Sequence, residues 1–278
     1  MKNFIKVIIS GSLFLLLGCS SDKTLSLVDN EQVCNNKNFK GCDTAANYYM
    51  KKKEYQKAVT YAKIGCNNNK AKSCEVLGKA YLDGKQVKKN LNKGLKFLEK
   101  SCTIGDGYVG CHDLAVRYSI IGFGIQKDYV KSSKYFKIAC EKGLYAEACY
   151  YLAFNYEYGR GMQKNDGLSV YYYRKALDFY KKECKNDFNG CKNVGEMYQD
   201  GKGVSKDLKK ALEYYHIGCE KNDGTSCFKI GMMYQFAKTY DQTQGYLIED
   251  AAKAKEYYLQ ACDNKYILGC ETFAKLNK

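Results

Sequence analysis

The sequence contains no proline and no tryptophan, and arginine occurs at only three positions, Arg117, Arg160 and Arg174. Without proline, no helix is interrupted by a residue that lacks a backbone N–H, and turns must be formed by glycine, asparagine and aspartate. The scarcity of arginine argues against nucleic acid as a partner, because proteins that bind it use arginine extensively. These absences favour a helical protein that recognises something other than nucleic acid.

Histidine is almost as scarce, with only His112 and His216, and no two of the 15 cysteines form the short C-x₂₋₄-C pair of a zinc site. We therefore expect no metal and no cofactor. The formal net charge is +15, and 45% of the residues are hydrophobic, which is enough for a folded core. The lysines alternate with acidic residues along the chain, as on the solvated faces of helices.

The N-terminus has the pattern of an export signal. Lys2 and Lys6 precede an apolar run from Val7 to Leu17, which is too short to span a bilayer comfortably. The run ends in Leu-Leu-Gly-Cys19, which resembles a bacterial lipobox, so we expect Cys19 to be lipidated. Ser20 after it is typical of lipoproteins sorted to the outer membrane, facing the periplasm or the cell exterior. A released, secreted form is the alternative.

The number of cysteines agrees with export to an oxidising compartment. If Cys19 carries lipid, 14 cysteines remain, an even number that predicts seven disulfides in an oxidising compartment. The remaining cysteines fall into pairs separated by short polar turns: Cys34 and Cys42, Cys66 and Cys74, Cys102 and Cys111, Cys140 and Cys149, Cys184 and Cys191, Cys219 and Cys227, and Cys262 and Cys270.

The segment between one pair and the next is a repeat of helix, loop and helix. In the clearest copy, 191–219, the apolar residues Val194, Met197 and Tyr198 have helical spacing. Gly201 and Gly203 then predict a turn, and Asp207 is the expected N-cap of a second helix. That helix presents an apolar face with Leu208, Ala211, Leu212 and Tyr215.

The pattern LG..Y..G.GV..D..KA..YY..AC resembles the Sel1-like repeat, a relative of the tetratricopeptide repeat. Matching residues include Leu77, Gly78, Tyr81, Gly84, Tyr156, Gly159, Gly161, Gly195, Val204, Ala254, Tyr257, Tyr258 and Ala261. With one cysteine pair per unit, the chain looks like the Helicobacter-type cysteine-rich proteins of that superfamily. The resemblance implies an all-α, right-handed α/α superhelical solenoid, in which the disulfides staple neighbouring units.

The expected organisation is a signal peptide (1–18), a lipidated tether (19–33) and a solenoid (34–278) of about six helix pairs with a C-terminal capping helix. The chain departs from the repeat pattern at four places. The first unit lacks the glycine loop, and Gln86 replaces the second loop glycine. Extra residues occur between Asp166 and Lys175, around Tyr171–Tyr173, and before Asp250, and we interpret both as insertions into loops.

The cysteine pairs fit a staple between units. The first cysteine of each pair ends one helix and the second begins the next, and a short turn brings such ends within the Cα separation that a disulfide requires. The two cysteines of a pair are separated by six, seven or eight residues, and we expect this variation in number to change only the turn. Each staple closes a small loop and should stabilise the array.

Relatives of this kind have been described as weak β-lactamases and penicillin-binding proteins, so the resemblance implies a hydrolase alternative. The S-x-x-K motif of serine β-lactamases occurs twice, at Ser20–Lys23 and Ser226–Lys229, which is as often as chance predicts. The other two motifs of these enzymes, S-D-N and K-T-G, do not follow either of them. Most tyrosines fall at core positions of the repeat. The sequence therefore favours a lipid-anchored scaffold that binds a protein, a peptide or a peptidoglycan-related ligand on its concave surface, and it assigns no catalytic residue.

Overall fold

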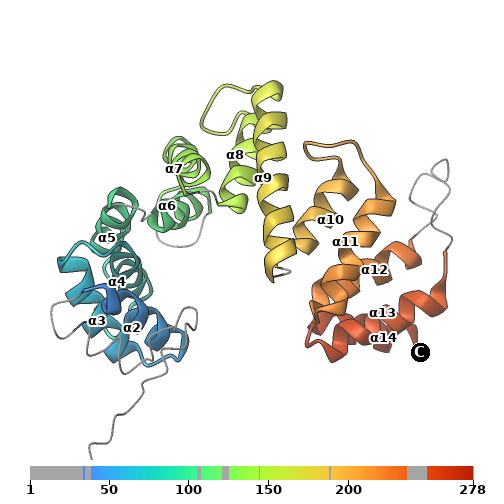
Figure 1. The fold of residues 1–278 in the computed structure, drawn as a ribbon, viewed down its shortest axis with the longest axis horizontal. Helices are drawn as coiled ribbons and strands as arrows, with labels where there is room; N and C mark the ends of the chain where they lie inside the picture. Colours follow the sequence, from blue (N-terminus) through green and yellow to red (C-terminus); the bar gives the residue numbers. More distant parts are fainter. Residues whose placement is uncertain are drawn as a thin grey trace, which may run out of the picture.

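The computed structural model describes Cys34 and residues 39–104, 108–120, 125–143, 145–187, 189–236 and 249–277. The predicted signal peptide, Cys19 and the tether lie outside these residues, as does most of the segment before Asp250. Within the described residues the chain is an all-α solenoid, as predicted, and its helices follow one another along an arch (Figure 1).

Thirteen helices, α2 to α14, occur in the described part of the chain. Their bounds are α2 Lys40–Lys51, α3 Tyr55–Asn67, α4 Ala71–Asp83, α5 Leu91–Thr103, α6 Val109–Ser119, α7 Tyr129–Glu141, α8 Ala146–Tyr158, α9 Asp166–Asp187, α10 Cys191–Asp200, α11 Leu208–Glu220, α12 Gly224–Gln235, α13 Ala251–Asp263 and α14 Ile267–Leu276. Consecutive helices pack against each other from α2 and α3 through α12 and α13, and α14 packs against α13 at the C-terminal end.

The second helix of most pairs begins at a side-chain cap. Asn90, Asp128, Asp207 and Asp250 each accept a hydrogen bond from the backbone N–H three residues later, at 2.9 Å. Such a bond satisfies one of the N–H groups that the first turn of a helix leaves unpaired. The prediction that Asp207 caps α11 is therefore confirmed.

In three pairs the loop between the helices begins at a glycine in the left-handed conformation, namely Gly84, Gly159 and Gly201. Gly201 ends α10 in the left-handed conformation, and Gly203 follows with φ of 72°. A Cβ atom at Gly203 would lie 2.7 Å from the backbone nitrogen of Arg174, so the loop also contacts the preceding unit closely. Gln86, which stands where a second glycine was expected, adopts φ of 56°, and the backbone conformation is therefore kept without glycine.

Seven disulfides occur in the described residues, and they pair the cysteines that the sequence groups together. Their Cα atoms are 4.5–4.8 Å apart, at the short end of the range that disulfides occupy. In six of them the first cysteine lies near the end of a pair's second helix, and the next cysteine lies in or beside the first turn of the following helix. Each of these six bonds therefore fixes the junction between two units, and Cys34–Cys42 ties the residue before the first unit to α2.

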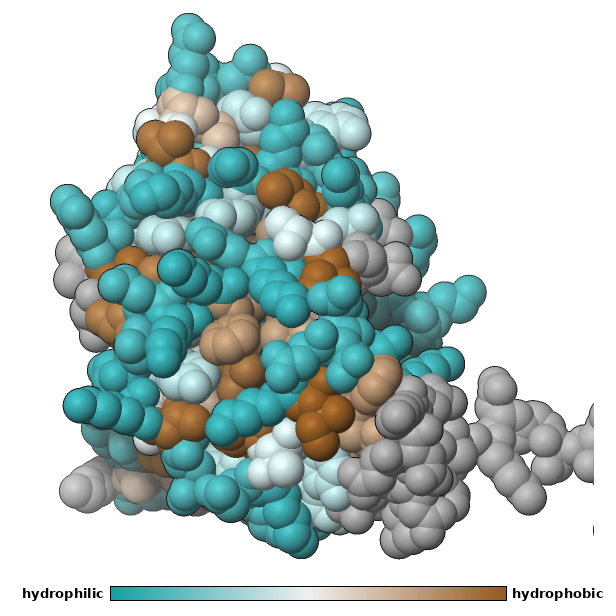
Figure 2. Space-filling model, turned by 90° about the vertical axis from the view of Figure 1, so that its left-hand side faces the viewer, coloured by the Kyte–Doolittle hydropathy of each residue, from teal (hydrophilic) through white to brown (hydrophobic). Residues whose placement is uncertain are grey.

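The core consists of one large cluster that runs from α4 to α10 and a smaller cluster at each end of the array. In the last of these, Leu208, Ala211 and Tyr215 of α11 are buried against Ile230 and Met233 of α12. The face visible in Figure 2 is mostly hydrophilic, with scattered apolar residues between charged ones. This agrees with the expectation that most lysines lie on solvated faces.

The expected loop insertion around Tyr171–Tyr173 is wrong, because these residues lie within α9, a single helix of 22 residues. In α5, α7, α11 and α13 the disulfide cysteine lies twelve residues after the cap. In α9 the first N–H groups bond to Asn165, and Cys184 follows nineteen residues later. The seven additional residues correspond to about two helical turns, so they lengthen the helix without turning its buried face away from the core.

Candidate inner surface of the arch

The first helix of each pair lies on the inner side of the arch. Helices α2 and α4, α4 and α6, and α12 and α14 contact one another directly, in addition to contacting their hairpin partners. In Figure 1, α6 lies on the inner side of the arch and its partner α7 on the outer side. We refer to α2, α4, α6, α8, α10, α12 and α14 as the inner layer.

Charged side chains connect the inner helices at the N-terminal end. Lys79 on α4 contacts Glu75 on its own helix at 2.5 Å and Asp113 on α6 at 2.8 Å. Glu75 is only 2% exposed and is also paired with Lys72 at 2.6 Å. A carboxylate this deeply buried requires such partners.

These ion pairs determine the pKa values of Lys79 and Asp113. Burial lowers the pKa of Lys79, but Asp113 and Glu75 raise it by more, so the net shift is upward and the ammonium stays charged. Burial raises the pKa of Asp113, and Lys79 opposes that shift. The Lys79 ammonium therefore connects α4 to α6 through Asp113, while Glu75 of its own helix adds a second partly dehydrated carboxylate.

Further pairs connect the next inner helices. His112 on α6 lies 3.3 Å from Glu147 on α8, and this contact with His112 holds the pKa of Glu147 below its usual value. The His112 ring also stacks on Tyr145, with centroids 6.0 Å apart. Further along, Glu196 on α10 pairs with Lys229 on α12 at 3.0 Å.

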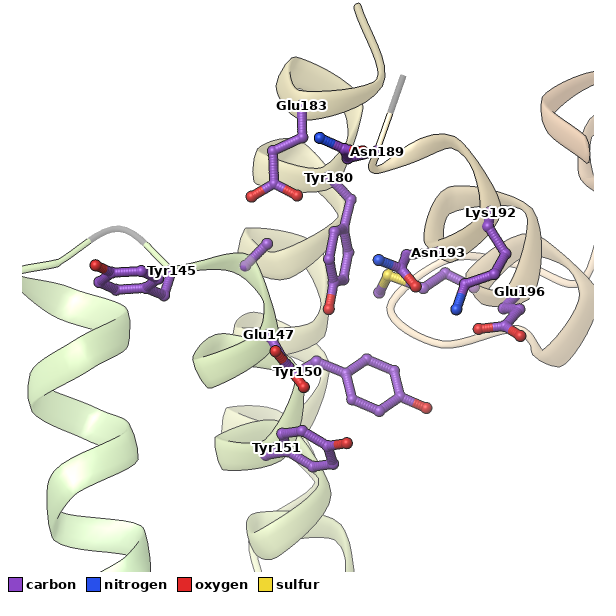
Figure 3. A pocket seen from close by; sticks show the side chains of 12 residues that line it. Tyr145, Glu147, Tyr150, Tyr151, Tyr180, Glu183, Asn189, Lys192, Asn193 and Glu196 are labelled. Carbon is purple, nitrogen blue, oxygen red and sulfur yellow. The ribbon is translucent and has the colours of Figure 1, made fainter. Parts of the chain in front are cut away.

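A cavity of about 620 Å³ lies between α8 and α10. The C-terminal half of α9 forms its back wall, and the views of Figures 1 and 3 place it near the middle of the arch. Its lining residues are Tyr145, Ala146, Glu147, Tyr150, Tyr151, Tyr180, Glu183, Asn189, Lys192, Asn193, Glu196 and Met197. The volume is within the range of pockets that bind small ligands or single side chains.

The length of α9 explains two of these lining residues. Tyr180 and Glu183 lie in the last turns of α9, beyond the point at which the other second helices reach their cysteine. The added turns extend α9 by about 10 Å, at 1.5 Å per residue. Tyr180 is only 6% exposed, and its ring extends from α9 down toward Tyr150 (Figure 3).

Carboxylates surround the tyrosine hydroxyls of the cavity. Burial raises the pKa of Tyr150 to about 12, and Asp200 and Glu196 add to the shift. Burial likewise raises the pKa of Tyr180, and the negative charges of Glu147 and Glu183 raise it further. These hydroxyls therefore remain protonated near neutral pH, and the cavity combines neutral phenols with negative charge.

The S-x-x-K motif that lies in the described residues, Ser226–Lys229, is not arranged for catalysis. The Ser226 hydroxyl is fully buried and donates a hydrogen bond to Asp223 at 2.5 Å, within the cap of α12. Lys229 is engaged with Glu196. The second candidate, Ser20–Lys23, lies outside the described residues.

The two histidines lie far apart in the fold, on α6 and α11, and His216 packs against Tyr257. No group of three or more histidine, cysteine or acidic side chains suited to a metal occurs among the described residues. In the same part of the chain, no helix is both long and apolar enough to cross a bilayer.

Sequence reasoning did not identify the cavity. Core positions of the repeat are expected to hold most tyrosines, and the sequence pattern singles out none of Tyr150, Tyr151, Tyr180, Glu147 and Glu196. The signal that could have located the site was the extra length before Cys184. It was noticed, but it was assigned to a loop.

Paired helices, glycine loops and an inner layer of first helices define an α-solenoid of the tetratricopeptide-related class. The model of the Sel1 repeat matches residues 71–106, 109–144, 146–178, 189–223 and 225–266, which is more than half of the chain. The chain therefore belongs to the Sel1 repeat family. The first unit, which lacks the glycine loop, lies outside the matched segments.

Similar proteins include cytochrome c oxidase assembly factors. The chain is 30% identical to assembly factor 7A of Xenopus laevis, over 61% of this chain and 69% of that protein. It is 31% identical to assembly factor 7 of Homo sapiens, over 40% of this chain and 48% of that protein.

Two solved structures have the same fold. A Sel1 repeat protein from Oxalobacter formigenes aligns with a TM-score of 0.62 and 24% identity, covering 85% of this chain and 88% of that chain. A protective antigen of uropathogenic Escherichia coli aligns with a TM-score of 0.58 and 21% identity. That alignment covers 90% of this chain but only 51% of the antigen, so this chain spans about half of its length.

Proposed function

We propose that this chain is a lipid-anchored extracytoplasmic scaffold that binds a protein, a peptide or a cell-wall component on the inner surface of the arch. The cavity between α8 and α10 carries this proposal, because it places polar and aromatic groups together on a surface held by disulfides. Solenoids of this type present long, rigid concave surfaces. The Xenopus and human relatives are named as assembly factors, which favours a protein as the ligand.

A photo-crosslinking amino acid at Asn193, which lines the cavity, should capture a ligand in intact cells. The matched control is the same amino acid at Asp178, an exposed position on α9 that does not line the cavity. We expect an adduct of discrete mass from Asn193 and none from Asp178, measured by immunoblot and mass spectrometry. Equal labelling from the two positions would contradict binding on the inner surface.

The proposed anchor has its own test, which uses a fatty acid that carries an alkyne label. We expect the wild-type chain to take up the label in a bacterial host, and Cys19→Ala to lose it completely, because the thiol at this position is the proposed site of acylation. Ser20→Ala is the control and should keep the label. A labelled Cys19→Ala variant would show that lipid is attached elsewhere or that the label is nonspecific.

Export to the outer membrane follows from the same reasoning and is part of the proposal. The hydrolase alternative rests on resemblance alone. Ser226 and Lys229 both have structural partners, and the relatives reported above are named for assembly and not for hydrolysis. We therefore propose no reaction for this chain.

A further inference from the structure

The charge of the α8–α10 cavity is opposite to that of the whole chain. The chain has a formal net charge of +15, but three carboxylates, Glu147, Glu183 and Glu196, and one ammonium, Lys192, line the cavity. Lys229, which does not line the cavity, pairs with Glu196, so these three carboxylates and two ammonium groups leave one net negative charge. Asp200, at the end of α10, lies near enough to raise the pKa of Tyr150. An anionic ligand would be repelled here, whereas a cation would be attracted.

The carboxylates lie on more than one wall. Glu147 comes from α8 and Glu183 from α9, and Glu196 faces them from α10 (Figure 3). The rings of Tyr150, Tyr151 and Tyr180 lie between these walls. A cation that entered the cavity could contact aromatic faces and carboxylates together, an arrangement that stabilises ammonium and guanidinium groups.

We propose that this cavity binds an arginine side chain from an extended basic segment of a partner protein. The proposal rests on the proposed function and narrows its ligand to a protein segment with positive charge. Arginine fits better than lysine, because its planar guanidinium stacks on aromatic rings and pairs with carboxylates in a fixed geometry.

The chain already uses this chemistry internally. The guanidinium of Arg160 lies 4.6 Å from the ring centre of Phe154, 5.5 Å from that of Tyr129 and 5.7 Å from that of Tyr158. The α8–α10 cavity offers several tyrosine rings with added negative charge and contains no arginine of its own. An arginine from outside would therefore complete an arrangement similar to the one around Arg160.

The test uses the full chain with its disulfides intact and a fluorescent Gly/Ser peptide with arginine at alternate positions. The same peptide with citrulline keeps the planar shape, but a carbonyl oxygen replaces one nitrogen of the guanidinium, which removes the charge and two of the five N–H donors. We expect the citrulline peptide to bind at least about tenfold more weakly in fluorescence anisotropy titrations, because charge-assisted hydrogen bonds are lost. A lysine peptide should bind with intermediate affinity.

The cavity itself is tested by the triple variant Glu147→Gln, Glu183→Gln and Glu196→Gln. Its matched control is Asp178→Asn, Glu213→Gln and Glu220→Gln, which neutralises three exposed carboxylates on α9 and α11 that do not line the cavity. Both triples change the net charge equally, so their general attraction for the peptide changes equally. We expect at least about a tenfold loss of affinity for the cavity triple and less than about twofold for the control.

Thermal unfolding of both triples, followed by circular dichroism, verifies that they remain folded. Equal affinity for arginine and citrulline peptides would overturn the proposal, as would equal affinity of the two triples. Tight binding of a peptidoglycan fragment, with no binding of the basic peptide, would also overturn it. If the cavity triple still gives the Asn193 photo-adduct in cells, the proposed function stands and only the arginine site fails. If Asn193 and Asp178 are labelled alike, the proposed function itself fails.

Discussion

Complete reduction of the seven disulfides is expected to unfold the solenoid at physiological temperature. Each disulfide closes a loop with a sequence separation of only 7–9 residues. A loop of this size removes chain entropy from the unfolded state that is equivalent to about 2.5–3 kcal/mol. Because the seven loops do not overlap in sequence, their contributions should add.

The sum is of the order of 18 kcal/mol, which is larger than the roughly 5–15 kcal/mol net stability of a typical domain. The cores at the two ends of the array offer limited compensation, because each has only eight buried residues shared by neighbouring units. In a repeat array, weakening every junction at once removes the nearest-neighbour terms on which the units depend. The reduced chain should therefore lose most of its helical signal.

The measurement is far-ultraviolet circular dichroism of the full chain, before and after reduction and alkylation of the thiols. Treatment with the alkylating agent alone is the control and should leave the spectrum unchanged, because all fourteen cysteines in the described residues are in disulfides. A reduced, alkylated chain that still melts cooperatively well above physiological temperature would show that packing alone holds the solenoid.

The features that were predictable from sequence are local ones. A cap depends on one side chain and the N–H groups three residues later, and a glycine turn depends on its own φ, so Asp207 and Gly201 could be assigned without knowing the fold. The cysteine pairs were predictable for a similar reason, because each disulfide joins the ends of consecutive helices.

The inner surface was not predictable in the same way, because it depends on which faces meet between units. Glu75 belongs to a stretch that alternates charge like any solvated helix, yet it is almost completely buried because Lys72 and Lys79 cover it. Tyr180 has the helical spacing of a core residue and is indeed buried. Its role in the cavity arises only because α9 continues past the usual end of a second helix.

Deleting Leu177–Glu183 from α9 should close the cavity while preserving the solenoid. The deletion removes seven residues, about two helical turns, and places Cys184 twelve residues after Asn165, as in the other second helices. Ala176 would then occupy the position before the cysteine, where α7 has Ala139 and α11 has Gly218. The small residue and the cysteine should both face the core.

The variant loses Tyr180 and Glu183, the two α9 residues that line the cavity, and α10 should move closer to α8. We expect seven disulfides by intact mass, a helical spectrum close to that of the wild type, and at least about a tenfold loss of affinity for the arginine peptide.

The matched control deletes only Leu177–Lys181. Five residues turn a helix by about 500°, which leaves the remainder of α9 and everything after it rotated by roughly 140° relative to α8. Lys182 would also occupy the buried position that Cys184 should take. This shorter deletion should therefore be the more damaging of the two, with a lower unfolding temperature and loss of cooperativity. If the two deletions are equally tolerated, the extra length of α9 is not two turns added in register, and the origin assigned to the cavity is wrong.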